Sequence, residues 1–547
     1  MNKRLRNNNV YTPFIAPFFY ENGAFFYLIC CMNKWLFLFV VFSHQCMAQS
    51  IDSVSFPNKY YFIGFLNPSP KVFELDTADI GYSTVQYHSF STNGQMIKAT
   101  HNQSFTDFLD VKLDITKFSQ EGIFLRENLK LYDLNSLFLF TNKKKNYSAK
   151  AMLTYQKIRM DENGGLSSNA SINIDEPKLN LVNLSFAQNL SKNRYHSFSQ
   201  TFSINDKYSL VNSISILKRQ KTYTDNFPAV GFYQHVFLDS TQTNDSISNE
   251  FLNGVVGFKF NHFTVSYLLF RRYFSNNHID TADIDNGMSI KYESDNQNST
   301  VDFKFYQSGE YNLKLDKAFG NKHNHHFLIV ANRQRAPIFY NTYISNHYQF
   351  QNNFEFQSAH SFTYKYKSPY VTLTSLLKHH TNYLFLDESS QAKQFSTSIL
   401  HISNELTTNW KLANFKGAHT LQHQWTDQQS VIRLPSFSAS STVWYENSLF
   451  DASLRLKMGF KAHYFTPYLA LAYNPSLASF HLQNETEIGG YPLIDAFVNF
   501  QISNMNVNVQ FQNLGYQLMD KPYYFVPNYI GQPGLIKLSL VWKLLNS

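Results

Sequence analysis

The segment LDVKLDIT at residues 109–116 alternates apolar and polar side chains without interruption. The segment MNVNVQFQ at residues 505–512 repeats this pattern close to the C-terminus. Because successive side chains of a β-strand point to opposite faces, each such strand has one apolar and one wet face. Strands of this kind recur from about residue 108 onward, which predicts an all-β chain. A single antiparallel transmembrane β-barrel suits the pattern best, because lipid covers the apolar faces and water the polar ones.

The composition favours a membrane barrel over a soluble β-sandwich or propeller. Only 16% of the 547 residues are charged, whereas 17% are aromatic, and soluble domains average about 25% charged residues. Phe and Tyr occur 52 and 35 times, as expected for the outer surface of a barrel with aromatic girdles. The net charge of +8 does not suggest binding to nucleic acid, which usually needs a clustered basic face.

The connections between the predicted strands alternate in length. Ser503-Asn504 joins two strands directly, whereas long polar connections occupy residues 161–177 and 239–250. Short turns alternating with long loops are typical of bacterial outer-membrane barrels, whose turns are periplasmic and whose loops are extracellular. At about 22–25 residues per strand and connection, we expect roughly 18–20 strands, forming one barrel over residues 101–547.

The N-terminal region predicts export to the cell envelope. From Met32 the chain has a lysine, an apolar core at Trp35–Phe42 and small residues at a cleavage position, which together predict a signal peptide at residues 32–48. We interpret residues 1–31 as an upstream extension of the gene model, with an N-terminal anchor helix as the alternative.

Residues 49–100 are less regular than the rest of the chain. Pro68 and Pro70 interrupt any strand there, so we expect a periplasmic segment or a small plug. All three cysteines precede residue 49, which leaves the exported part without disulfides or thiol chemistry.

The polar faces of the strands supply candidate lumen-facing residues. Both signs of charge share these faces, so a mixed, solvated lumen is expected and ion selectivity is left open. The candidates are Asp110, Lys112, Asp114, Asp302, Lys304, Lys314, Asp316, Asn506, Asn508 and Gln510.

No residue pattern predicts catalysis, a cofactor or a metal site. The histidines at 323, 325 and 326 are spaced so that their rings alternate in direction, and no cysteine or carboxylate completes a ligand set. We interpret them as part of a polar turn. A nucleophile motif such as G-x-S-x-G in a strand–turn–helix setting does not occur, so we expect a protein that is not an enzyme.

Three segments resemble the putative porin family of outer-membrane β-barrels. They are YSAKAMLTYQKIRMDENGGL (147–166), GGYPLIDAFVNFQISNMNVNVQFQNLG (489–515) and YYFVPNYIGQPGLIKLSLVWKLLN (523–546). Their order and spacing are similar to the family along the whole exported chain. The segment at 59–73 fits more loosely, because the glycine-rich form expected there is reduced to Gly64. The resemblance implies an outer-membrane barrel and says little about the substrate.

The final strand is the expected signal for membrane insertion. Its outward face is formed by Leu538, Leu540, Trp542 and Leu544. The family resemblance implies an aromatic residue at the very end, which the insertion machinery reads, but here Trp542 is the nearest aromatic. We still expect insertion, because the apolar face of this strand is continuous.

These observations together predict a porin-like channel of the bacterial outer membrane for passive diffusion of small hydrophilic solutes. Alternatives are a transporter of hydrophobic small molecules plugged by residues 49–100, and a structural or adhesive barrel that transports nothing. A receptor-like barrel coupled to an energy-transducing protein is a further alternative, but its N-terminal plug domain would need more than about 100 residues. Expected partners are outer-membrane lipids, the barrel-insertion machinery and small solutes, without nucleic acid, and the oligomeric state is left open.

Overall fold

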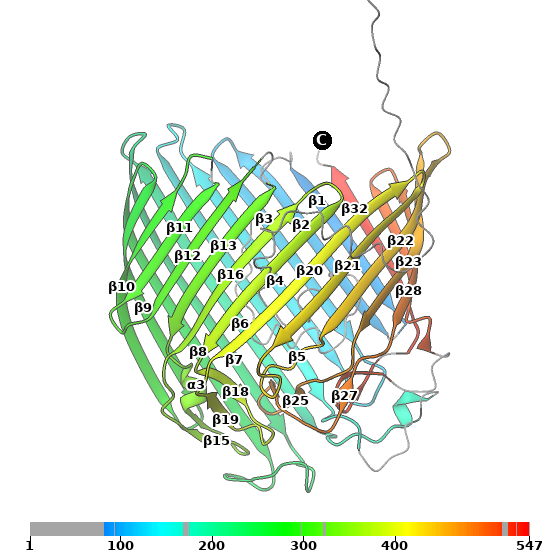
Figure 1. The fold of residues 1–547 in the computed structure, drawn as a ribbon. Helices are drawn as coiled ribbons and strands as arrows, with labels where there is room; N and C mark the ends of the chain where they lie inside the picture. The colour runs from blue at the N-terminus through cyan, green and yellow to red at the C-terminus, as the bar shows by residue number, and fades with distance from the viewer. Residues whose placement is uncertain are drawn as a thin grey trace, which may run out of the picture. The chain divides into compact units, whose positions relative to one another are not determined.

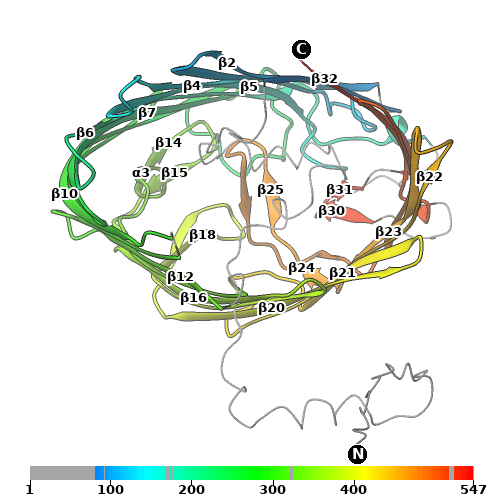
Figure 2. The ribbon, with the colours of Figure 1, turned by 90° about the horizontal axis from the view of Figure 1, so that it is seen from above.

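One antiparallel sheet of 22 strands forms the wall of the barrel in the computed structural model (Figure 1). The sheet closes on itself because β1 (Tyr82–Phe90) pairs with β32 (Leu535–Leu545), and Figure 2 shows the closed ring. The predicted all-β barrel is therefore confirmed. The structure describes residues 81–91, 93–167, 173, 176–296, 298–320, 324–516, 523–531 and 533–545.

The wall strands follow one another around the ring in chain order. Between β1 and β32 they are β2 (Gly94–Thr106), β3 (Leu109–Gln120), β4 (Leu129–Thr141), β5 (Tyr147–Glu162), β6 (Ala187–Ser203), β7 (Tyr208–Asp225), β8 (Thr243–Phe260), β9 (Phe263–Asn276), β10 (Asp280–Glu293), β11 (Ser299–Tyr306), β12 (Tyr311–Phe319), β13 (His325–Gln334), β16 (Gln357–Lys367), β17 (Val371–Thr381), β20 (Ile399–Leu412), β21 (Phe415–Thr426), β22 (Phe437–Leu449), β23 (Leu454–Phe465), β28 (Leu493–Ile502) and β29 (Met505–Gln512).

The wall has more strands than the expected 18–20, and it begins earlier than residue 101. The connections at one end are only two to five residues long, so each hairpin needs fewer residues than the estimate assumed. β1 and the first half of β2 lie inside the segment 49–100 that was expected to precede the barrel. They were missed because β1, YSTVQYHSF, carries few apolar residues on its outer face. Residues 1–80, with the predicted signal peptide, lie outside the described residues.

The two ends of the barrel differ. At the short-turn end the connections are brief, and Tyr82 pairs there with Leu545. At the long-loop end the chain makes its extended connections, including residues 163–186, 226–242, 335–356, 466–492 and 513–534. This matches the predicted alternation of short turns and long loops. Among the described residues no helix is long and apolar enough to cross a membrane.

The two faces of the wall differ in polarity, as the alternation predicts. On β8, Val256 is 63% exposed on the outside, and on β23 Phe460 is 61% exposed. The opposite face of each wall strand points into the barrel. On β32, for example, Lys537 and Ser539 of this inner face are buried. The apolar outer surface is the part of the wall that lipid would cover.

Several long loops fold back into the barrel and form small elements there (Figure 2). These elements are α3 (Ile338–Asn341), β14 (Thr342–Ile344), β15 (Gln349–Gln351), β18 (Tyr383–Leu386), β19 (Ala392–Phe395), β24 (Tyr468–Leu469), β25 (Ala472–Asn474), β26 (Ser479–His481), β27 (Glu487–Ile488), β30 (Tyr524–Val526) and β31 (Tyr529–Ile530). A short 3-10 helix, η2 (Pro177–Leu179), lies in the loop after β5. We call the inward-folded parts of loops 335–356, 382–398, 466–492 and 513–534 the loop layer.

Candidate transport path

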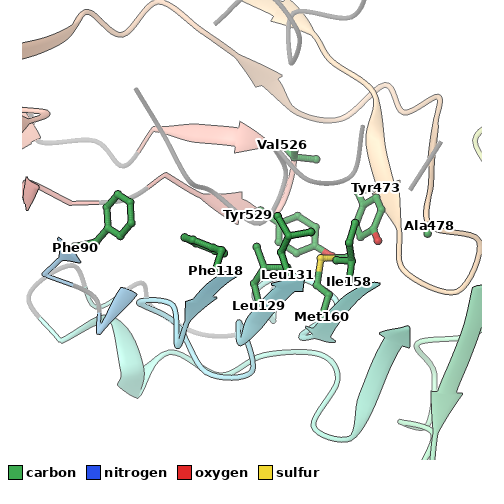
Figure 3. Packing of buried hydrophobic residues seen from close by; sticks show 10 residues of the cluster. All are labelled: Phe90, Phe118, Leu129, Leu131, Ile158, Met160, Tyr473, Ala478, Val526 and Tyr529. Carbon is green, nitrogen blue, oxygen red and sulfur yellow. The ribbon is translucent and has the colours of Figure 1, made fainter. Parts of the chain in front are cut away.

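Apolar side chains join the loop layer to the inner face of the wall. Tyr473 and Ala478 from loop 466–492 and Tyr529 from loop 513–534 are buried in one cluster with wall residues of β3, β4 and β5. Figure 3 shows Tyr529 beside Leu131 of the wall, and Tyr473 beside Ile158 and Met160. The inner faces of β3, β4 and β5 thus turn from polar to apolar near the long-loop end, because that is where the loops pack.

A second apolar cluster joins three loops of the layer to one another. Tyr343 and Phe350 of loop 335–356 pack with Leu386 of loop 382–398 and Leu477 of loop 466–492, against Phe274 of β9. The layer is therefore a small hydrophobic core inside a polar barrel, and it is a feature that freely solvated loops would lack.

Buried polar groups of the wall hold the hairpin formed by β25 and β26. Asn189 of β6 donates to the carbonyl oxygen of Pro475 at 2.8 Å and to Oε1 of Glu162 at 2.7 Å. The Tyr473 hydroxyl also donates to Glu162, at 2.9 Å. Lys221 Nζ donates to the carbonyl oxygen of Ser476 at 2.8 Å. Since these bonds tie the hairpin to three wall strands, β5, β6 and β7, the wall sets the position of the hairpin.

Asn346 links two loops at the long-loop end. Its Oδ1 accepts the backbone N–H groups of Leu238 and Asp239 at 3.1 and 2.8 Å, and its Nδ2 donates to the Asp239 carbonyl at 2.8 Å. The neighbouring His347 stacks on Tyr233, with ring centroids 3.7 Å apart. Burial lowers the pKa of His347, against opposing effects of the His235 carbonyl and Asp225.

An outer cavity of about 450 Å³ lies among the long loops. Polar side chains and tyrosines line most of it. Residues of six loops contribute, among them Asn183, Tyr233, Tyr348, Glu388, Asn474 and Asn528. A cavity of this size can hold a small solute. The side chains that line it offer mostly hydrogen-bond donors and acceptors.

An inner cavity of about 580 Å³ lies between the wall strands β6 to β13 and the loop layer. Its lining combines basic side chains with aromatic rings such as Phe251, Phe270 and Tyr306. The basic side chains are Arg219, Lys221, Arg272, Arg333 and Arg335, and within the described part of the chain Glu310 is the only acidic side chain of the lining.

The tip of the β25–β26 hairpin separates the two cavities. Tyr473, Asn474 and Pro475 line the outer cavity, whereas Leu477, Ala478 and Ser479 line the inner one. The two cavities are therefore neighbours along the barrel, divided by a segment of about six residues.

Part of the inner cavity's charge is neutralised by an ion-pair cluster. Arg272 contacts Asp283 at 2.8 Å and Glu310 at 3.3 Å. Arg335 contacts Asp283 at 3.0 Å, Asp285 at 3.1 Å and Glu310 at 3.2 Å. Two arginines thus face three carboxylates, and the excess of positive charge in the cavity comes from its other basic side chains.

The structure distributes the predicted lumen-facing residues over separate strands and does not gather them into one site. Asp110, Lys112 and Asp114 share the face of β3 that carries the buried Phe118. On β29, Asn506, Asn508 and Gln510 share another face.

Among these candidates, opposite charges lie close together. Lys304 lies 3.7 Å from Asp302 on β11, and Lys314 lies 3.2 Å from Asp316 on β12. Gln510 donates to Asp495 at 3.0 Å.

At Arg271-Arg272 the sequence predicts that only one of the two side chains faces the lumen, and the structure places Arg272 in the inner cavity. The other basic residues of this cavity were not singled out, since isolated Arg and Lys residues occur on many strands. For the loop layer the sequence did hold a signal. The segment YLALAYNPSLASF in loop 466–492 is too apolar for a solvated loop, which indicates that this loop is buried.

The final strand presents the predicted outward face. Trp542 is 55% exposed and Leu538 is 37% exposed, while Leu540 and Leu544 are half-buried on the same side. Their role in membrane insertion stays a prediction. Among the described residues, no group of three or more His, Cys, Asp and Glu could hold a metal ion. His326 lies 2.7 Å from Asp316 as an isolated contact, and His323 lies outside the described residues.

Comparisons with solved structures identify outer-membrane receptors of the same fold. The iron transporter FrpB of Neisseria meningitidis has a TM-score of 0.57 at 10% identity, covering 85% of this chain and 82% of that one. The ferric enterobactin receptor of Pseudomonas aeruginosa has a TM-score of 0.59 at 10% identity, covering 85% and 81%. The ferric preacinetobactin receptor of Acinetobacter baumannii has a TM-score of 0.55 at 9% identity, covering 85% and 80%. At these identities the likeness concerns the fold.

Sequence comparisons identify the family. No curated protein matches the chain in sequence. The model of the family described as "putative porin" matches residues 76–546, which include every described strand of the barrel. Family and barrel fold together imply the bacterial outer membrane. The chain belongs to the putative porin family.

Proposed function

We propose that this protein carries small hydrophilic solutes across the outer membrane, along a path that the loop layer narrows. The path leads from the outer cavity past the tip of the β25–β26 hairpin into the inner cavity and the lumen. The observation that carries this proposal is the placement of two cavities on either side of one hairpin tip, the outer one lined mostly by polar groups and the inner one by basic side chains among aromatic rings. In this proposal solutes move down their concentration gradient.

The linings of the cavities support a polar solute over a hydrophobic one. Amide, hydroxyl and carboxylate groups dominate the outer cavity, and arginine and lysine side chains line the inner one. An apolar ligand would leave these groups without hydrogen-bond partners, which costs free energy. The positive excess of the inner cavity favours solutes that carry a negative charge.

Single-channel conductance of the purified protein in a planar bilayer tests the proposal. We expect a small, steady conductance for the natural chain and a severalfold larger one after removal of residues 474–479. A matched control removes residues 428–430 from the exposed connection between β21 and β22, which should leave conductance unchanged. Heat-modifiable gel migration verifies that each variant is folded. If all three folded proteins are silent, the proposed path is wrong.

A plugged transporter is the second candidate, and the hydrophobic clusters of the loop layer favour it. Barrels of 22 strands commonly enclose a plugged lumen, and here the packed loops occupy the barrel at one end. In that case the natural chain would be silent and the variant lacking residues 474–479 would conduct. The same recording therefore separates a narrowed channel from a transporter whose loops must first move.

A further inference from the structure

The outer surface of the wall carries a cluster of basic side chains near the long-loop end. We call it the basic patch, and it spans five adjacent strands, β3 to β7. Its members are Lys117, Lys130, Lys157, Arg159, Lys192, Arg194 and Lys218. They alternate along their strands with residues that point into the barrel, such as Phe118, Ile158 and Asn193, so the patch faces away from the lumen.

Like charges lie directly opposite one another in this patch. Lys130 pairs across the sheet with Arg159, Lys157 with Lys192 and Arg194 with Lys218. Directly opposed like charges destabilise a sheet. An anion from outside the chain that bound over these pairs would offset the repulsion between them.

Carboxylates of the chain balance only a small part of this charge. Glu250 of β8 lies 3.4 Å from Lys218. Asp161 at the edge of the patch lies 3.9 Å from Arg126 and accepts hydrogen bonds from Asn128 and Gln188. Within the described ranges, the other six members of the patch have no carboxylate within 4.0 Å.

The patch lies where the lipid headgroups of the adjacent leaflet would be. On β7 the outward residues run from Tyr208 at the short-turn end through exposed Leu210 and Ile214 to Lys218, ten residues further along. A transmembrane strand needs about 9–11 residues to cross the hydrocarbon layer. On β5 the aromatic Tyr155, whose ring lies 6.2 Å from that of Tyr132, precedes Lys157. An aromatic belt followed by basic residues marks a membrane interface.

We propose that the basic patch binds the phosphate groups of anionic lipid in the leaflet next to the long loops. The patch continues directly into exposed apolar residues of the wall, including Leu153 and Phe198. An occupant with a phosphate head and acyl chains matches both parts, whereas a free phosphate ion matches only the first. Arginine and lysine bind phosphate through charge-assisted hydrogen bonds. This inference does not depend on the proposed function.

Binding of a phosphate-headed lipid to the natural full chain tests the proposal. The natural protein is compared with a variant combining Lys130→Gln, Lys157→Gln and Lys192→Gln in nanodiscs of phosphatidylcholine. The ligand is fluorescent phosphatidic acid at low mole fraction. We expect the triple variant to bind about tenfold more weakly, and the binding of the natural protein to weaken with added salt. The control variant, Lys143→Gln, Lys144→Gln and Lys145→Gln, has the same change of charge in an exposed short turn and should bind as the natural protein does.

Two further measurements distinguish the sources of phosphate and the effect of folding. Inorganic phosphate at millimolar concentration should not displace the lipid. Full displacement would identify a site for a free anion and overturn the lipid proposal, as would equal binding by the natural and triple-variant proteins. In neutral detergent the triple variant should unfold at the same temperature as the natural protein or higher, because repulsion is removed. Phosphatidic acid should raise the unfolding temperature of the natural protein only. If the triple variant does not fold, Lys157→Gln alone is tested in the same way.

Discussion

Arg335 and Asp283 join the loop layer to the wall. Nη1 of Arg335, the first residue after β13, lies 3.0 Å from Oδ2 of Asp283 on β10. Asp285 and Glu310 contact the same guanidinium at 3.1 and 3.2 Å, and both are more than nine-tenths buried. Three carboxylates from the wall therefore fix the point at which loop 335–356 leaves the strand and enters the barrel.

Replacing Arg335 should loosen this loop. In Arg335→Gln the buried carboxylates lose one cation, and removing one partner of such a group is destabilising by about 1–3 kcal/mol for a partly exposed cluster. We expect a lower urea midpoint and more frequent opening events in single-channel recordings. Arg271→Gln is the control, because Arg271 is exposed on the outer face and lies outside the cluster. Identical recordings for Arg335→Gln and the natural chain would show that the cluster does not restrain the loop.

Asn346 should be needed for the contact between loops 226–242 and 335–356. Asn346→Ala removes the acceptor of two backbone N–H groups and the donor to the Asp239 carbonyl, leaving partly buried groups unsatisfied. We expect faster cleavage within these loops by added protease, while the wall stays intact. Gln429→Ala, in an exposed connection, serves as the control. Unchanged cleavage rates in Asn346→Ala would contradict this assignment.

The sequence could predict the wall because alternation of apolar and polar residues is imposed by lipid on one side and water on the other. LDVKLDIT and MNVNVQFQ both form wall strands, β3 and β29. Beyond the apolar content of loop 466–492, it could not predict how the loop layer packs, because Tyr473, Leu477 and Tyr529 become buried through contacts with wall strands and loops distant in the chain. The ion-pair cluster around Arg335 was also beyond prediction, since the alternation within one strand does not show which side chains of β9, β10, the β11–β12 connection and the end of β13 meet.

Acid should weaken the packing of His347. Its Nδ1 donates to the His235 carbonyl at 2.9 Å, and its Nε2 accepts from the Thr243 hydroxyl at 2.7 Å. Burial lowers the pKa of His347 below the ordinary value of about 6.5. A lowered histidine pKa means that the unfolded loop binds a proton more readily than the folded one, so stability is complete above about pH 6.5 and is lost as the pH falls below it.

Limited proteolysis between pH 8 and pH 5 measures this effect. Cleavage of loops 226–242 and 335–356 should accelerate below about pH 6.5 in the natural chain. In His347→Gln the rate should vary less with pH, because the titrating ring is absent. A natural chain whose cleavage follows only the protease's own pH dependence would refute the role of His347.

The assigned faces of the wall can be tested at two neighbouring valines of β8. Val256 is 63% exposed on the outer face, between Phe258 and Gly254, whereas Val255 is half-buried on the opposite face. Val256→Arg places a charge against lipid near the middle of the membrane, which costs about 2–4 kcal/mol, whereas a lumen position is more tolerant. The two variants have the same change in composition and differ only in direction. We therefore expect a lower unfolding midpoint in urea for Val256→Arg than for Val255→Arg in lipid vesicles, and equal losses would mean that the two faces of β8 do not meet lipid and water as assigned.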